Sequence, residues 1–79
     1  MVTVRYWAGA RAAAGCTEEV VDAGTVGDLV AAIGRRPPLA RVLSASSLLV
    51  DGSAVHRDDV EHPLRGGAVV DVLPPFAGG

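Results

Sequence analysis

Residues 68–79 read AVVDVLPPFAGG, an apolar run that passes directly into two prolines and ends on two glycines. The run AVVDVL favours a buried strand. Pro74 stops it, because proline has no N–H group to give to a central ladder. We therefore expect a core strand that ends there and a tail over residues 74–79, which spans roughly 20 Å if extended.

The tail consists of Pro74, Pro75, Phe76, Ala77, Gly78 and Gly79. The prolines favour an extended stalk because their φ angle is fixed. Gly78 and Gly79 have no Cβ atom that would obstruct a narrow channel, and Gly79 carries the terminal carboxylate. A thin tip of this kind suits a pocket in another protein. The alternative interpretation is an ordinary frayed terminus, in which glycine is also common.

Further strands are predicted upstream of this stretch. Residues 2–7 read VTVRYW and alternate, with every second side chain on one face, which is typical of a strand. A short strand is predicted within EEVVDA, residues 18–23, and another within SLLVDG, residues 47–52. The pair Asp51-Gly52 favours a tight turn, so that residues 54–55 can return as the second arm of a hairpin.

The clearest helix begins after Thr25, which can cap it while Asp28 returns the hydrogen bond, a variant of the capping box. The apolar positions then recur at helical spacing and form one stripe: Val26, Leu29, Val30 and Ile33. Gly34 ends this helix. A second, shorter helix is predicted from Pro37, and an Ala-rich turn of helix before Gly15.

The predicted order along the chain is strand, short helix, strand, long helix, short helix, strand, hairpin arm and strand, and residues 56–67 between the last two are mostly loop. This order favours an α+β fold with a mixed sheet covered on one face by the main helix. At 79 residues the chain is expected to form one domain, residues 1–79, with a modest core.

Composition argues against several classes of function. The chain is 49% hydrophobic, which is too apolar for a disordered segment, and its net charge is −2. The seven positive residues are all arginines and are scattered, so we expect no nucleic-acid partner and no membrane partner. A lone Cys16 fits a reducing compartment, and no apolar run is long enough to span a membrane. We expect a cytoplasmic protein.

Catalytic and metal-binding groups are not evident. His56 and His62 lie in a loop without a third ligand nearby, so no metal site is predicted. The acidic residues 58, 59 and 61 lack an apolar pocket that would separate their pKa values. Nucleotide-binding glycine motifs are absent from the sequence, which makes ATP binding by this chain unexpected.

Four stretches together resemble one known family: VTVRYWA at residues 2–8, TVGDLVAAI at 25–33, LLVDG at 48–52 and HPLRGGAVVDVLPPFAGG at 62–79. They are similar to the sulfur-carrier family of ubiquitin-like β-grasp proteins, which includes the thiamine sulfur carrier and the small subunit of molybdopterin synthase. The two prolines followed by a diglycine, directly after a terminal strand, are the most specific part. The resemblance implies a β-grasp fold.

The resemblance to the molybdopterin synthase subunit also implies a mechanism and two partners. An E1-like adenylyltransferase/sulfurtransferase would use ATP to adenylate Gly79, and sulfur would then replace an oxygen to give a C-terminal thiocarboxylate. The tail would enter the large subunit of molybdopterin synthase and give its sulfur to a cyclic pyranopterin precursor. The chain itself would hold no cofactor and no catalytic residue.

Other functions stay open at this point. The family includes sulfur carriers for thiamine, cysteine or specialised metabolites. A ubiquitin-like modifier, whose Gly79 is amide-linked to lysines of other proteins, shares the adenylation step and differs in what attacks afterwards. A stand-alone enzyme is a third and weaker alternative, because no nucleophile, base or cofactor loop is found.

Trp7 and Leu73 are the candidate partner-binding residues. They belong to strands that would be neighbours in a β-grasp sheet, and both can lie on the face away from the helix. An exposed apolar patch at these positions would be the docking surface, since aromatic anchors dominate such interfaces. The alternative is that both are core residues.

Overall fold

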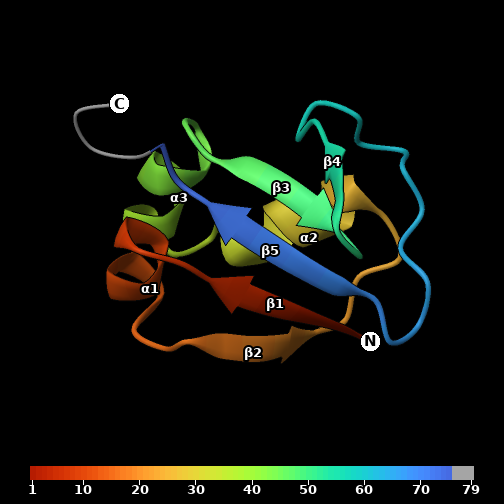
Figure 1. The fold of residues 1–79 in the computed structure, drawn as a ribbon, viewed down its shortest axis with the longest axis horizontal. Helices are drawn as coiled ribbons and strands as arrows, with labels where there is room; N and C mark the ends of the chain where they lie inside the picture. The colour runs from red at the N-terminus through yellow and green to blue at the C-terminus, as the bar shows by residue number, and fades with distance from the viewer. Residues whose placement is uncertain (76–79) are drawn as a thin grey trace.

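The computed structural model describes residues 1–75, in which five strands form one mixed sheet in the order β2-β1-β5-β3-β4 (Figure 1). The strands are β1 (Val2–Tyr6), β2 (Glu18–Val21), β3 (Ser47–Val50), β4 (Ser53–Val55) and β5 (Val69–Leu73). The last strand lies at the centre, parallel to β1 and antiparallel to β3. This is the β-grasp arrangement that the sequence predicts.

Three helices cover one face of the sheet: α1 (Gly9–Ala14), α2 (Val26–Ile33) and α3 (Pro37–Leu43). The Thr25 hydroxyl accepts a hydrogen bond from the N–H of Asp28 at 3.1 Å and so caps α2 as predicted. Pro37 and Pro38 occupy the first turn of α3, and Gly15 ends α1 with a φ of 76°. Helices α1 and α3 pack together at the end of the sheet where β5 finishes (Figure 1).

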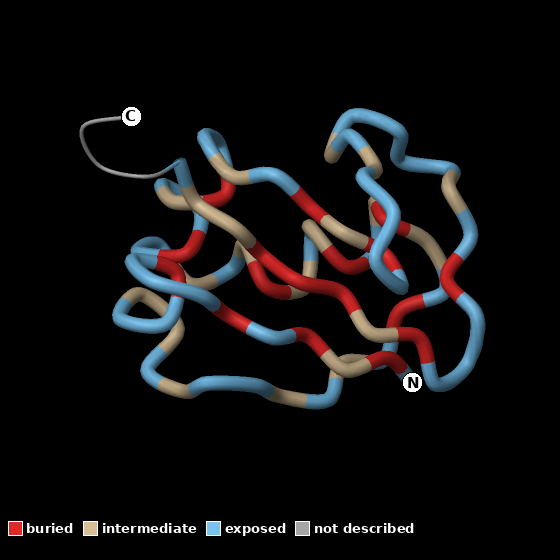
Figure 2. Tube along the Cα trace, viewed as in Figure 1, coloured by how far each residue is buried: buried red, intermediate tan, exposed pale blue. Residues whose placement is uncertain are grey.

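The core lies between the sheet and the helices, as the buried stretches in Figure 2 show. Every second residue of the central strands faces it, and the strand residues that belong to the core are Val2, Val4, Tyr6, Leu48, Val50, Val70 and Val72. Helix α2 contributes Val26, Leu29 and Ile33 to the core, and α3 contributes Leu39 and Leu43. Val30 is half-buried and packs at the margin of the core. The predicted stripe is therefore confirmed, with Val30 at its edge.

Two local features set the positions of the hairpin and of α2. Asp51 and Gly52 both have positive φ angles, 48° and 86°, which is the turn that a two-residue hairpin requires. In the loop between β4 and β5, the carbonyl groups of Val60 and His62 accept hydrogen bonds from the first N–H groups of α2, each at 2.9 Å. The loop thus satisfies donors that a helix end otherwise leaves open.

In residues 1–75, no helix is long and apolar enough to cross a membrane.

Candidate functional site: the surface where the tail leaves the sheet

Strand β5 carries the chain directly to the predicted tail. Leu73 is its last residue and pairs with Ser47 of β3, after which Pro74 is half-buried and Pro75 is exposed. The remaining predicted tail residues, Phe76, Ala77, Gly78 and Gly79, lie outside the described residues. The described part of the chain thus contains the root of the tail at the end of a central strand.

Trp7 lies immediately beside this root. It follows the last residue of β1, and its backbone N–H group donates a hydrogen bond to the Val72 carbonyl at 3.3 Å. Because Tyr6 pairs with Val72 in the parallel ladder, Trp7 is level with Leu73. Trp7 is 40% exposed, and Leu73 is half-buried. Both alternate with core residues, which places them on the face away from the helices, and the core alternative for Trp7 is wrong.

A carboxylate holds the indole in place. Asp71 Oδ1 accepts a hydrogen bond from Trp7 Nε1 at 2.8 Å and another from Arg5 Nε at 2.8 Å, and its Oδ2 accepts from an Arg5 terminal nitrogen at 3.1 Å. Asp71 is only 7% exposed, although it lies on the outer face. The hydrogen bonds from Arg5 lower the pKa of Asp71 despite its burial, which alone would raise it. The carboxylate is therefore ionised and accepts three hydrogen bonds.

Two arginines flank the Trp7 ring. The guanidinium carbon of Arg5 is 5.8 Å from the ring centroid, and that of Arg11 in α1 is 5.9 Å from it. These distances are within the range of cation–π attraction. The indole is thus fixed by a hydrogen bond at its edge and by cations near its faces, and part of it remains open to solvent.

The geometry presents a fixed aromatic side chain next to the end of strand β5 and the two prolines that follow it, and comparison with known proteins identifies the family. Residues 4–79 match the model of the ThiS family. The chain belongs to the ThiS family. No curated protein is significantly similar to it in sequence.

Solved structures agree with this assignment to the ThiS family. Small archaeal modifier protein 1 from Haloferax volcanii is 27% identical, with a TM-score of 0.80, over 99% of this chain and 98% of that one. A Pyrococcus furiosus protein assigned to subunit 1 of molybdopterin converting factor is 29% identical, with a TM-score of 0.80, over 95% and 97% of the two chains. A Helicobacter pylori complex of subunits 1 and 2 of molybdopterin-converting factor contains a chain with 23% identity and a TM-score of 0.77, over 99% and 97% of the two chains, which supports the fold.

On the helix side of the sheet, a polar cluster ties together the elements that surround this ThiS-family site. The Tyr6 hydroxyl donates to the Glu19 carboxylate, and Arg36 donates to both Glu19 and the Tyr6 oxygen. Arg36 also donates to the Ala14 carbonyl at the end of α1, at 3.3 Å. Burial raises the pKa of Tyr6 well above its usual range, and the Glu19 carboxylate adds to this. Strands β1 and β2 and helices α1 and α3 are therefore joined just below Trp7.

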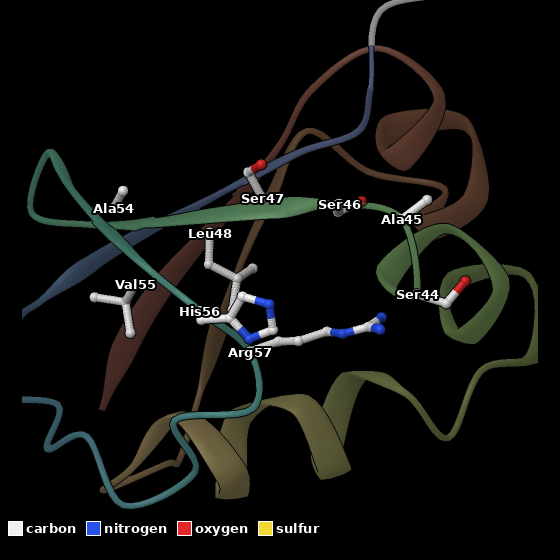
Figure 3. A pocket seen from close by; sticks show the side chains of 9 residues that line it. All are labelled: Ser44, Ala45, Ser46, Ser47, Leu48, Ala54, Val55, His56 and Arg57. Atoms are coloured by element: carbon white, nitrogen blue, oxygen red, sulfur yellow. The ribbon is translucent and has the colours of Figure 1, made fainter.

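A cavity of about 470 Å³ opens between the β3–β4 hairpin and the end of α3 (Figure 3). Three of its polar side chains, Ser44, Ser46 and Arg57, already donate hydrogen bonds to the protein's own backbone. The hydroxyls of Ser44 and Ser46 donate to carbonyls of α3, and Arg57 donates to the Leu43 carbonyl at 2.9 Å, which caps the helix end. We therefore assign no ligand to this cavity.

The two loop histidines each have an acidic neighbour. His56 and His62 each lie near one carboxylate, Asp58 and Asp59 respectively, and within residues 1–75 no group of three possible ligands is placed to hold a metal ion.

Sequence reasoning missed the pairing of Arg5 with Asp71. A signal for it exists in the sequence. Asp71 is the one charged residue of the apolar run AVVDVL, and it lies two positions before Leu73, on the same face of the strand. Arg5 likewise lies two positions before Trp7, on the same face as that residue. Once β1 and β5 are assumed to be parallel neighbours, these residues can face one another. The register that brings them opposite each other comes only from the structure.

Proposed function

We propose that this ThiS-family protein is a sulfur carrier in the biosynthesis of molybdopterin, with Gly79 as the acceptor. The observation that carries the proposal is the junction at Leu73, where a central strand passes into Pro74 and Pro75 beside an anchored, partly exposed Trp7. The molybdopterin-converting-factor assignment of the Pyrococcus furiosus protein adds support for this pathway.

The chemistry begins from a carboxylate that is ionised near neutral pH and is a poor electrophile. An E1-like adenylyltransferase/sulfurtransferase would activate it: a Gly79 oxygen attacks the α-phosphate of ATP, and pyrophosphate leaves. A sulfide equivalent then displaces AMP from the acyl adenylate and leaves a thiocarboxylate. Gly78 and Ala77 keep the tip narrow, and Phe76 with the two prolines extends it into the large subunit of molybdopterin synthase, where the pterin precursor takes the sulfur.

In this scheme the chain binds no cofactor, and ATP is used by its partner. Its own residues contribute positioning: Asp71 and Arg5 orient Trp7, and Trp7 with Leu73 docks the surface from which the tail projects. The active site belongs to the large subunit.

The tail can be tested directly. One alanine added after Gly79 should abolish sulfur loading, because the reactive carbonyl would be held in a peptide bond. Gly78→Val should slow loading less completely, since a β-branched side chain stiffens and widens the tip. The assay is thiocarboxylate formation with the adenylating partner, ATP and a sulfur source, with an alanine added before Met1 as the matched control. An untrimmed, extended protein that loads as fast as the parent would refute the proposal.

A ubiquitin-like modifier is the second candidate, and the similarity to small archaeal modifier protein 1 at 27% identity favours it. Both functions need adenylation of Gly79 and differ in the nucleophile that follows. Intact-mass spectrometry of the protein from its native cell separates them. Exchange of one oxygen for sulfur indicates the carrier, whereas conjugates to other proteins indicate the modifier.

A further inference from the structure

The two arginines beside the Trp7 ring differ in what balances their charge. The Arg5 guanidinium donates to both oxygens of Asp71, so its charge is neutralised within the chain. Arg11 lacks such a neighbour, because within residues 1–75 no carboxylate lies at ion-pair distance from it. Arg11 is also exposed. It therefore brings a positive charge to the surface beside the indole that the described part of the chain does not balance.

The backbone between β1 and α1 fixes the position of Arg11 relative to Trp7. Arg11 Nε donates to the Tyr6 carbonyl at 3.4 Å, and the guanidinium carbon is 5.9 Å from the centroid of the Trp7 ring. Between strand and helix, Ala8 has a φ of 48° and a ψ of −124°. A non-glycine residue at a positive φ is strained and persists only where the surrounding structure holds it. The turn at Ala8 leads the chain directly into α1, which carries Arg11.

Docking on Trp7 would change the surroundings of Arg11. Because the guanidinium lies over the ring, a protein that covers the indole also removes water from Arg11. A charged group that loses water is costly unless a group of opposite charge and suitable hydrogen-bonding geometry replaces that water. Asp71 already does this for Arg5. For Arg11 the replacement must come from the protein that docks, and the planar guanidinium is best matched by a carboxylate.

We infer that Arg11 binds the side-chain carboxylate of an Asp or Glu in the large subunit of molybdopterin synthase, beside the Trp7 indole. The inference rests on the proposed function, in which Trp7 and Leu73 dock against that subunit. It adds a residue that determines specificity: a protein that covers Trp7 without supplying a carboxylate leaves Arg11 without water and without a counter-charge. Such a penalty against the wrong partner is one way in which an interface becomes selective.

The test measures the Kd of the purified full chain for the large subunit of the source organism by titration calorimetry. Arg11→Gln, which removes the charge, should bind about tenfold more weakly than the wild type, and Arg11→Glu, which reverses it, more weakly still. The matched controls are Arg41→Glu in α3 and Arg65→Glu in the loop after β4, both exposed arginines given the same change of charge. Their Kd should stay within about twofold of the wild type, because a distant exposed charge contributes little.

A charge swap then identifies the carboxylate. The Asp and Glu residues on the surface of the large subunit are changed to Arg one at a time, and one of these variants should bind Arg11→Glu more tightly than it binds the wild-type chain. Thermal melts verify that each chain is folded, and Arg11→Gln serves if Arg11→Glu is not.

Three results would overturn the inference: wild-type affinity in the Arg11 variants, an equal loss in Arg41→Glu, or no large-subunit variant that prefers Arg11→Glu. Each of them leaves the proposed function standing, provided that the wild-type chain binds the large subunit. A wild-type chain that does not bind the large subunit refutes the proposed function and the inference together.

Discussion

The indole N–H of Trp7 donates a 2.8 Å hydrogen bond to Asp71, a residue 64 positions further along the chain. Parallel pairing of β1 with β5 makes this contact possible, and Arg5 completes it by donating to both carboxylate oxygens. A tryptophan at the root of the tail is therefore held in one orientation before any partner arrives, which reduces the entropy that binding must remove.

Replacing Asp71 by Asn should loosen the indole. The amide keeps the size of the side chain but removes the negative charge that holds Arg5. The hydrogen bond from Trp7 Nε1 then goes to a neutral acceptor instead of a carboxylate and is weaker. Because Trp7 is the single tryptophan, its fluorescence reports the change directly. We expect easier quenching by acrylamide in Asp71→Asn and no change in the control Asp58→Asn, whose side chain is exposed on the distant loop. Identical quenching in the two variants would show that Asp71 does not restrain the ring.

Truncating the ring tests the docking surface. Trp7→Ala should weaken binding to the large subunit by about 2 kcal/mol or more, as for a buried aromatic anchor, with little loss of stability. Titration calorimetry of the complex, with a thermal melt of the free chain, provides both values. Val60→Ala removes an exposed apolar side chain from the loop after β4 and should leave binding unchanged. Equal losses in the two variants would place the interface elsewhere.

The Asp71 carboxyl should also make stability depend on pH. Its pKa in the folded protein is lowered, chiefly by the hydrogen bonds from Arg5. A carboxyl of this kind stabilises the fold fully above its ordinary pKa of about 3.9, and the contribution is lost as the pH falls below that value towards the lower folded pKa. The free energy of unfolding should therefore fall more steeply between about pH 5 and pH 3 in the wild type than in Asp71→Asn. The lowered pKa of Glu19 acts equally in both proteins, so parallel curves would contradict the assignment.

Gly27 should resist substitution because α2 lies close to the loop after β4. A Cβ atom on Gly27 would lie 2.9 Å from both the Cβ and the carbonyl oxygen of Val60. We expect Gly27→Ala to lower the free energy of unfolding by about 1–3 kcal/mol, as overpacking does. Gly9→Ala in α1 is the control, because an added Cβ there meets nothing within 4 Å. Denaturant unfolding should show a lower free energy of unfolding for Gly27→Ala than for Gly9→Ala. If the two variants are equally stable, the loop after β4 moves away from α2 at no cost in free energy.

Much of this fold is predictable from local signals. Proline and glycine positions mark the ends of α1, α2 and β5, and the Asp51-Gly52 pair marks the hairpin turn. The helix stripe and the alternating strands follow from spacing, because one face of each element must meet the core. The β-grasp arrangement follows from the resemblance to a family, and the structure confirms it.

Other features could not be read from spacing. Whether Trp7 belonged to the core or to the surface depended on which face of β1 the helices cover, and both faces carry large side chains. The Arg36 contacts with Tyr6 and Glu19 join three separate elements whose approach no local pattern encodes. The partner-binding role of Trp7 and Leu73 and the acceptor role of Gly79 stay predictions.

The central place of β5 has a consequence for synthesis of the protein. A chain that stops before Val69 contains β1 and β3 with nothing to join them, since each pairs with β5 and the sheet order separates them. It would consist of two isolated strand pairs with open edges, which are marginal in water and prone to aggregation. Native folding must therefore wait for the segment that leads into the tail. Proteolysis of incomplete chains would then leave a population in which every folded copy has strand β5 and the prolines that follow it.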